Sequence, residues 1–405
     1  MMNVELPKKI YQARPDLILN IDNEYMTFLL MDQLKRYYGN GAVAMPQRHY
    51  LNRFVRDMRN WTEQYVDFMH YTVPLTTGVG GGYKFPSEYM GQYGVFEAVR
   101  HIYNSTGLKH LVSKDGSELH VSKKYFSTDS EKAIQDIRSS WRAANGMNDE
   151  QTVIFYAAGN EINEAKFTAE ATRKGIREFL LKYSAPTSLS AKARPLDNFV
   201  TVISTHVGSA GEQYIKEFVR ETDWMGRVVF VNNEEDEHLN AMCAADFGII
   251  HDGQMVSSAA ACHLPTMNCF NMRMHNQFYN ELFNRWWNDM NIIADNQVYP
   301  EMIGGEVWFG KIADTLGSWY LNPDTRYLMI RKFDGFVKEA MSYKPIDRTQ
   351  VTTRDIILND GKAYDVYVDP FTVATNKIWA DMQDYQLVGD SLHNHDAIRT
   401  RIQMM

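Results

Sequence analysis

The fold is decided by three short apolar runs: Val228-Val-Phe-Val231, Phe247-Gly-Ile-Ile250 and Leu264-Pro-Thr-Met-Asn-Cys-Phe270. Each run has the length and composition of a buried strand. Helical patterns lie between them, at Glu235–Ala245 and Ser257–Cys262. Strands that alternate with helices predict a parallel sheet with helices on both faces. Ligands of such sheets bind beyond the carboxyl ends of the strands, so we expect any site to lie there.

The same alternation extends toward the N-terminus. Thr152–Tyr156 and Phe199–Ile203 are expected as early strands of this sheet, with the amphipathic helix Glu164–Tyr183 between them. Further upstream, Asp16–Ile21 predicts a strand and Met26–Tyr38 predicts a helix. The sequence therefore predicts an α/β protein with two Rossmann-like domains, the first of them shortened.

The domain boundaries follow from these patterns. We expect the shortened first domain at residues 1–145 and the second at residues 146–320. Ser127–Ala144 is expected to be a linking helix that stops at Asn145-Gly146. Asn322–Ala340, within residues 321–345, is expected to be a helix that returns to the first domain.

Residues 346–405 form an additional C-terminal tail. Ile356–Val368 predicts a β-hairpin with an Asn-Asp-Gly turn, and Thr375–Gln383 predicts a short helix. Two interpretations of the tail are equally good at this stage. It is a binding arm for another molecule, or a strap that packs on its own domain.

The segment Asn291–Ile303 contains the strongest candidate binding residues. Proline has no N–H and suits the first turn of a helix, so Pro300 predicts a helix start. Glu301 would then lie in that first turn, where the positive helix end favours a carboxylate. A carboxylate in this place could accept hydrogen bonds from a sugar or ribose.

Six segments in collinear order between residues 17 and 345 resemble the lipid-A-disaccharide synthase family. They are Gly78–Gly81, Gly94–Arg100, Phe155–Glu164, Ala244–Gly253, Ala259–Phe270, and Asn291–Ala294 with Val298–Ile303. The resemblance implies the two-Rossmann architecture called GT-B, a UDP-linked sugar donor and a lipid acceptor. It also implies a nucleotide-sugar site in which Asn291 and Glu301 contact the nucleotide. Gly253 would approach the phosphates, and Gly159 lies in the matching phosphate loop.

The chain departs from the family where chemistry is required. Glu161 stands in place of a phosphate-binding arginine, and a carboxylate there would repel a diphosphate. Ser258 stands in place of the glutamate expected to hold the ribose, and Asp252 adds a negative charge nearby. The segment between Arg100 and Thr152 is too short for the family's aspartate-bearing section, so no catalytic residue is assigned. Such residues act as a unit, and their joint loss indicates a pseudoenzyme.

Two functions remain open. In the first, the chain is a non-catalytic scaffold or accessory subunit of a larger protein complex and binds no cofactor. We expect that complex in the mitochondrion, associated with the inner membrane, or otherwise in the cytoplasm as a peripheral membrane protein. In the alternative, the chain is an active hexosyltransferase that uses a UDP-sugar and a lipid acceptor.

Composition limits the remaining partners. The net charge of −8 argues against nucleic acid, and no apolar run has the length of a membrane span. Three cysteines, Cys243, Cys262 and Cys269, are expected to be buried thiols. No metal site is predicted, because His393-Asn-His395-Asp396 lacks a fourth ligand and lies in a polar tail.

An aromatic stripe in Gln277–Met290 is the candidate membrane or protein contact. Its helical spacing predicts an amphipathic face, of which core packing is the plain interpretation. Because Trp286 and Trp287 are adjacent, one of them is expected to point away from the core. The family resemblance, whose members act at membranes, implies a second interpretation, in which Phe278, Trp286 and Trp287 contact membrane lipid or another protein.

Overall fold

A computed structural model describes most of the chain, and the structural statements below concern the described residues alone. They are residues 5–13, 18–21, 30, 32–34, 36, 47–51, 68–71, 87–89, 91–122, 124–159, 162–184, 194–251, 255–270, 286, 288–294, 296–304, 307–341, 354–357 and 363–387. The chain forms two compact units. The first comprises Met1–Tyr93, Ser342–Arg354 and Tyr367–Met405, and the second comprises Gly94–Met341 and Asp355–Val366.

The first unit contains a four-stranded sheet in the order β1-β2-β3-β4, with every neighbouring pair parallel. Its strands are β1 (Ile18–Ile21), β2 (Gln47–Leu51), β3 (Phe68–Tyr71) and β4 (Ser87–Tyr89). The helices α1 (Glu5–Ala13) and α14 (Pro370–Leu387) belong to the same unit. Leu34 is fully buried and packs with Ile10, Tyr11, Ile18 and Leu30. The predicted first strand is confirmed.

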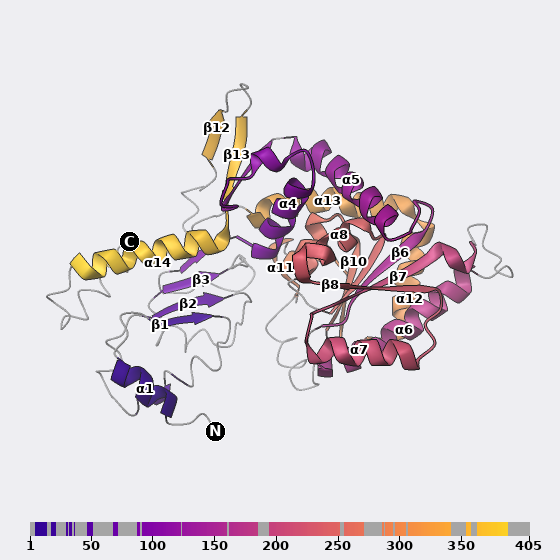
Figure 1. Ribbon diagram of the computed structural model, residues 1–405, viewed down its shortest axis with the longest axis horizontal. Coiled ribbons are helices and arrows are strands. Elements are labelled where there is room, and N and C mark those ends of the chain that lie inside the picture. Colours follow the sequence, from indigo (N-terminus) through magenta and orange to yellow (C-terminus); the bar gives the residue numbers. More distant parts are fainter. Residues whose placement is uncertain are drawn as a thin grey trace. The chain divides into compact units, whose positions relative to one another are not determined.

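The second unit is built around a six-stranded parallel sheet (Figure 1). Its strands are β6 (Thr152–Ala157), β7 (Phe199–Thr205), β8 (Arg227–Asn232), β9 (Phe247–Ile250), β10 (Thr266–Phe270) and β11 (Glu301–Ile303). Their order is β8-β7-β6-β9-β10-β11, which is the doubly wound Rossmann order. All residues of β6, β7 and β9 are buried, which explains their continuous apolar sequence.

Two layers of helices cover this sheet, one on each face, as Figure 1 shows for the second unit. One layer contains α6 (Ile162–Ser184), α7 (Ala210–Glu221) and α12 (Phe309–Leu321), and α6 packs against both others. The other layer contains α5 (Ser130–Ala144), α8 (Glu237–Ala244), α9 (Met255–Ala261), α11 (Asp289–Ala294) and α13 (Pro323–Met341). Within that layer α5 packs on α8, and α13 packs on α9 and α11. The predicted α/β fold class, with its GT-B-like pair of parallel sheets, is confirmed.

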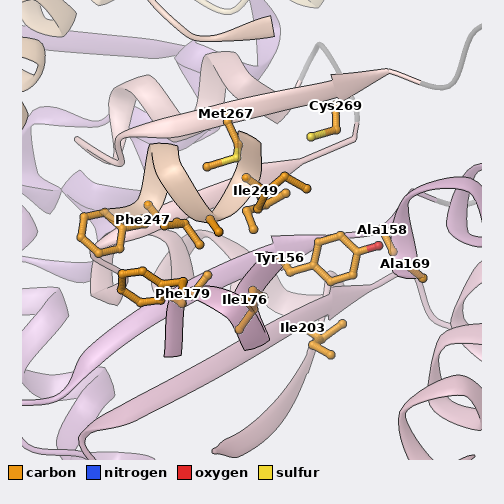
Figure 2. Close-up of a cluster of buried hydrophobic side chains, with 14 of the residues drawn as sticks. Tyr156, Ala158, Ala169, Ile176, Phe179, Ile203, Phe247, Ile249, Met267 and Cys269 are labelled. Carbon is orange, nitrogen blue, oxygen red and sulfur yellow. The ribbon is translucent and has the colours of Figure 1, made fainter. Parts of the chain in front are cut away.

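The main core lies between the sheet and the layer that contains α6 and α12. Figure 2 shows strand side chains such as Phe247, Ile249 and Met267 facing Ile176 and Phe179 of α6. Gly175 of α6 allows α12 to pack closely on α6, because an added Cβ at this position would lie 2.7 Å from Ile312 Cβ of α12. The two helices can approach closely only because this position carries no side chain.

The C-terminal β-hairpin is present. Its strands, β12 (Arg354–Ile357) and β13 (Ala363–Val368), form a three-stranded sheet with β5 (Glu118–Ser122), in the order β12-β13-β5. The connection between β12 and β13 is too short for a parallel crossover, so the pair is a hairpin. Tyr364 and Val366 are buried, which favours the strap interpretation for this part of the tail. The helix after it, α14, is longer than predicted.

Helices near the expected domain boundaries pack inside the second unit. The expected linking helix is α5, which directly follows a single π-helical turn (Tyr125–Asp129). It is preceded in the same unit by α4 (Tyr93–Ser105). The expected return helix is α13, whose main contacts are α9 and α11. The predicted boundaries at residues 145, 320 and 345 stay predictions.

One predicted element is wrong. Pro300 does not start a helix, and Glu301 is instead the first residue of strand β11. The Pro300 carbonyl accepts a hydrogen bond from Asn268 N at 2.8 Å, so the backbone continues the sheet beside β10. Proline is well suited to the start of an edge strand, because its missing N–H leaves no donor unpaired. Pairing with β10 therefore overrides the local helix signal.

Candidate functional site

The topological switch point of the six-stranded sheet lies between β6 and β9. The chain leaves β6 toward α6 on one face and leaves the neighbouring β9 toward α9 on the other face. A crevice opens where such connections diverge, and it is the usual ligand site of this architecture. Gly159 follows β6 and His251 follows β9, so both predicted segments reach this place.

Gly159 is required by conformation and by packing. Its φ of +92° lies in the region that side-chain-bearing residues avoid. A Cβ added to it would lie 2.7 Å from Glu164 Oε2 and 2.9 Å from His251 Cδ2. The close approach that a glycine permits is therefore used by two of the chain's own side chains. We predicted instead that a phosphate would approach this loop.

Glu164 and His251 form the centre of the switch point. Glu164 lies in the first turn of α6, where the helix dipole favours a negative charge. In nucleotide-binding sheets this helix end usually takes a phosphate. His251 is 6% exposed. Its backbone N–H donates to Ala157 O at 3.0 Å, and its side-chain Nε2 lies 3.8 Å from Glu164 Oε1. The position that suits an anionic ligand already holds a carboxylate.

Ser258 has a structural contact of its own. Its hydroxyl Oγ donates to Gly94 O at 3.0 Å and the residue is buried. This bond ties α9 to the first turn of α4. The position where the resemblance expects a ribose-binding glutamate therefore holds two helices together.

Asn291 uses its whole side-chain amide within its own loop. The oxygen Oδ1 accepts from Val298 N at 2.7 Å and from Tyr299 N at 2.9 Å. The nitrogen Nδ2 donates to Tyr299 O and to Glu301 Oε1, both at 2.9 Å. An amide side chain has two acceptor and two donor positions, so none is left for a nucleotide. The structure brings Asn291 and Glu301 into contact with each other, and the contact of both with a nucleotide stays a prediction.

Glu301 is held by the same loop. Its Oε1 accepts from Asn291 Nδ2 and also from Asn288 N at 2.8 Å and Asn288 Nδ2 at 2.7 Å. The sequence analysis did not predict a role for Asn288. It caps α11, because its Oδ1 accepts from Asn291 N at 2.8 Å. The signal was available, since an asparagine directly before a short helical pattern is a preferred cap.

A second polar cluster lies at the ends of β7 and β8 and was not predicted. His101 of α4 lies with its Nδ1 3.5 Å from Asp236 Oδ2 and its Nε2 2.8 Å from Asn240 Oδ1. Asp236 has a φ of +59°, and the hydrogen bond from His101 lowers its pKa. Burial is the main cause that lowers the pKa of His238 to about 4, and His206 and His101 add to it. The cluster joins α4 to α8.

The other predicted site residues lie outside the described part of the chain. These are Gly253, Asp252, Glu161, Phe278, Trp287, the Gly78–Gly82 segment and the His393–Asp396 segment. Trp286 is described and is half-buried. Cys243, Cys262 and Cys269 are free and buried, as predicted. In the described ranges, no group of three or more His, Cys, Asp or Glu side chains is arranged to hold a metal ion. None of the described helices is long and apolar enough to cross a membrane.

The chain matches no protein-family model and no curated protein sequence. Solved structures of similar shape include UDP-GlcNAc 2-epimerase from Neisseria meningitidis bound to UDP-GlcNAc, at 12% identity and a TM-score of 0.47, with 83% of this chain and 77% of that chain covered. A UDP-forming α,α-trehalose-phosphate synthase from Burkholderia vietnamiensis gives 10% identity, a TM-score of 0.42 and coverages of 83% and 74%. MurG from Acinetobacter baumannii gives 12% identity and a TM-score of 0.38, with 82% of this chain and 71% of that chain covered. With TM-scores below 0.5, these likenesses assign no role to any residue.

Proposed function

We propose that this chain is a non-catalytic accessory subunit of a larger protein assembly, built on a glycosyltransferase-type fold whose nucleotide site is filled by its own side chains. The observation that carries the proposal is Gly159. The space above it holds the carboxylate of Glu164, whose Oε2 would lie 2.7 Å from a Cβ at this position. A diphosphate would have to displace that carboxylate and would be repelled by it.

The two residues expected to contact a nucleotide, Asn291 and Glu301, support the same non-catalytic function. Asn291 and Glu301 are hydrogen-bonded to each other and to the loop between them. A ribose could gain these groups only by breaking bonds of buried polar atoms, which costs free energy for each bond lost. The site residues therefore act as structural supports at the carboxyl edge of the sheet.

Exposed apolar surface supports a role in an assembly. Trp308 is 57% exposed and lines an open hollow of about 420 Å³. The hollow lies along α12, and its other lining residues are Lys311, Asp314, Thr315, Ser318 and Trp319. Exposed tryptophan is enriched at protein contacts. We place the assembly at the mitochondrial inner membrane, on the argument that a bacterium making lipid A would keep the active residues.

Calorimetric titration of the purified full chain with UDP and with UDP-GlcNAc tests the proposal. We expect no binding in the micromolar range by the wild-type protein. A matched variant, Glu164→Gln, keeps the size of the side chain and removes its charge. If the carboxylate excludes the diphosphate, this variant gains measurable UDP affinity while the wild type has none.

Micromolar UDP binding by the wild-type chain would refute the proposal and favour the alternative, a UDP-sugar-dependent transferase. In that event, hydrolysis or transfer from UDP-GlcNAc to a lipid acceptor would be assayed next. The Gly159→Ala variant would then be the control, because a side chain at this position blocks the loop in either case.

A further inference from the structure

The two edge strands of the six-stranded sheet differ in how they are protected. β11 has three residues, follows Pro300 and begins with Glu301. Short length, proline and charge are the usual means by which an edge avoids pairing with another chain. β8 has six residues, all in register with β7 from Val200↔Arg227 to Thr205↔Asn232. It contains no bulge and no proline, and no described strand pairs with its outer edge.

The composition of β8 also favours pairing. Val228, Val229, Phe230 and Val231 are uncharged, and Phe230 is 37% exposed. The one charged residue is Arg227, whose guanidinium is already used within the chain. Its Nη1 donates to Gly146 O at 2.9 Å and its Nη2 donates to Asn145 O at 2.7 Å. A regular edge with an apolar centre, which no described strand pairs on its outer side, is a template for another strand.

We propose that β8 is a dimerisation edge that pairs with β8 of a second copy of this chain, antiparallel about a two-fold axis. Residues that lie opposite each other in an antiparallel pair point to the same face of the sheet. The register must therefore pair odd-numbered residues with odd-numbered residues and even-numbered residues with even-numbered residues. A register centred on Val229 places Val228 opposite Phe230 of the second copy. A register centred on Phe230 places Val229 opposite Val231 of the second copy. Both registers join apolar residues on both faces.

The charges around the strand select a second copy as the occupant. An antiparallel arrangement places the two Arg227 residues at opposite ends of the paired strands, so they do not repel. The exposed charged side chains of α7 include Lys216, Glu217, Arg220 and Glu221, two of each sign. A two-fold axis perpendicular to the sheet keeps each helix layer on its own side and brings α7 near its copy. The balanced charges of α7 allow that approach.

This inference does not depend on the proposed function, because an active transferase could pair through the same edge. Its test is therefore an oligomeric state and not a ligand affinity. Sedimentation equilibrium on the full chain is expected to show a dimer at micromolar concentration. Phe230→Lys adds a charge at the centre of the pair, and we expect it to raise the dissociation constant by about tenfold or more. Leu328→Lys is the control. Leu328 is 62% exposed on α13, and the main contacts of α13 are with α9, α11 and α12, not with β8.

Cysteine crosslinking provides a second test that does not rely on a destabilising charge. With diamide as the oxidant, Val229→Cys or Phe230→Cys is expected to give a disulfide-linked dimer, according to which residue faces its own copy. The native cysteines are buried and supply a low background. A monomeric wild type, or a dimer that persists in folded Phe230→Lys, would overturn the proposal. If Phe230→Lys fails to fold, the absence of crosslinked dimer in both cysteine variants has the same meaning.

Discussion

The amino and carboxyl edges of the six-stranded sheet are both closed by the chain's own polar groups, but in different ways. At the amino edge, Arg142 is 1% exposed and donates to Ala244 O at 2.8 Å, Gln151 O at 2.8 Å and Asp246 Oδ2 at 2.9 Å. Asp246 also accepts from Val153 N at 2.8 Å. One ion pair thus joins α5, β6 and the segment before β9.

At the carboxyl edge the contacts are divided between two separate groups of residues. Glu164 and His251 fill the space above Gly159, and Asn291 holds the loop before β11. The amino edge of such a sheet usually serves stability, and the carboxyl edge usually binds ligand. From these contacts we predict that both edges contribute to the stability of this chain, and that the amino edge contributes more. Four predictions test that difference, from the largest expected effect to the smallest.

Arg142→Met should lower the free energy of unfolding by about 3–5 kcal/mol, because it removes the more deeply buried of the two arginines that pair with Asp246 and also the donor to three backbone carbonyls, Ala244 O, Asn148 O and Gln151 O. Urea unfolding followed by circular dichroism measures the change. Arg138→Met is the control. Arg138 also donates to Asp246, at 2.7 Å, but its side chain is more exposed than that of Arg142. Its substitution should therefore lower the free energy of unfolding by less. A loss below about 1 kcal/mol for Arg142→Met would mean that the amino edge does not dominate.

Acid should weaken the carboxyl edge through His238. The folded-state pKa of His238 is lowered from 6.5 to about 4, so between these values the unfolded chain binds the proton and the folded chain does not. Its contribution to stability is complete above pH 6.5 and is lost as pH falls toward 4, by about 3 kcal/mol in total. Urea unfolding at several pH values measures this loss. His238→Gln should flatten the wild-type slope in that window, and an unchanged slope would refute the assignment.

Asn291→Ala should lower the free energy of unfolding by about 1–3 kcal/mol, because it removes the acceptor of the buried Tyr299 N–H and of the partly buried Val298 N–H. Hydrogen exchange of those two amides should accelerate more than exchange in β6. Asn322→Ala is a matched control, because Asn322 is exposed and its side chain makes one bond, to Ser318 O. Equal effects of the two substitutions would show that the Asn291 loop is not a support.

Gly159→Ala and Gly208→Ala separate crowding from backbone strain. Both glycines have positive φ, +92° and +73°, but no atom lies within 4 Å of the Cβ position of Gly208. Both variants should lose stability through strain, and Gly159→Ala should lose about 1 kcal/mol more through contact with Glu164 and His251. Thermal unfolding compares them. Adding Glu164→Ala to Gly159→Ala should recover part of the difference, and equal losses in the two single variants would remove the argument from crowding.

The amino-acid sequence alone predicted many of the strands and helices of the second unit. Buried parallel strands are apolar on both faces, so β6, β7, β9 and β10 stand out as short apolar runs between turn residues. The helices α6 and α5 were equally clear from their periodicity. The hairpin in the tail followed from its turn sequence, but its attachment to β5 could not be read, because that pairing joins segments far apart in the chain.

The strand ends at which the candidate residues lie were predictable, but the contacts of those residues were not. The resemblance and the strand ends directed attention to Gly159, Asn291 and Glu301. Which atoms occupy the space beside them depends on contacts across long sequence separations, such as that between Glu164 and His251. The helix predicted at Pro300 failed for the same reason, because the partner strand β10 lies in another part of the chain.

The sequence by itself determined the alternation of strands and helices, the positions of most of the described elements in the second unit and the residue types at the candidate site. Those are properties of local pattern and of residue chemistry. Only the tertiary structure decided the sheet order, the strand at Glu301, the closure of the switch point and the open edge at β8. Each of these depends on which distant segments meet, and hydrogen bonds and close packing are made between segments only when the chain folds.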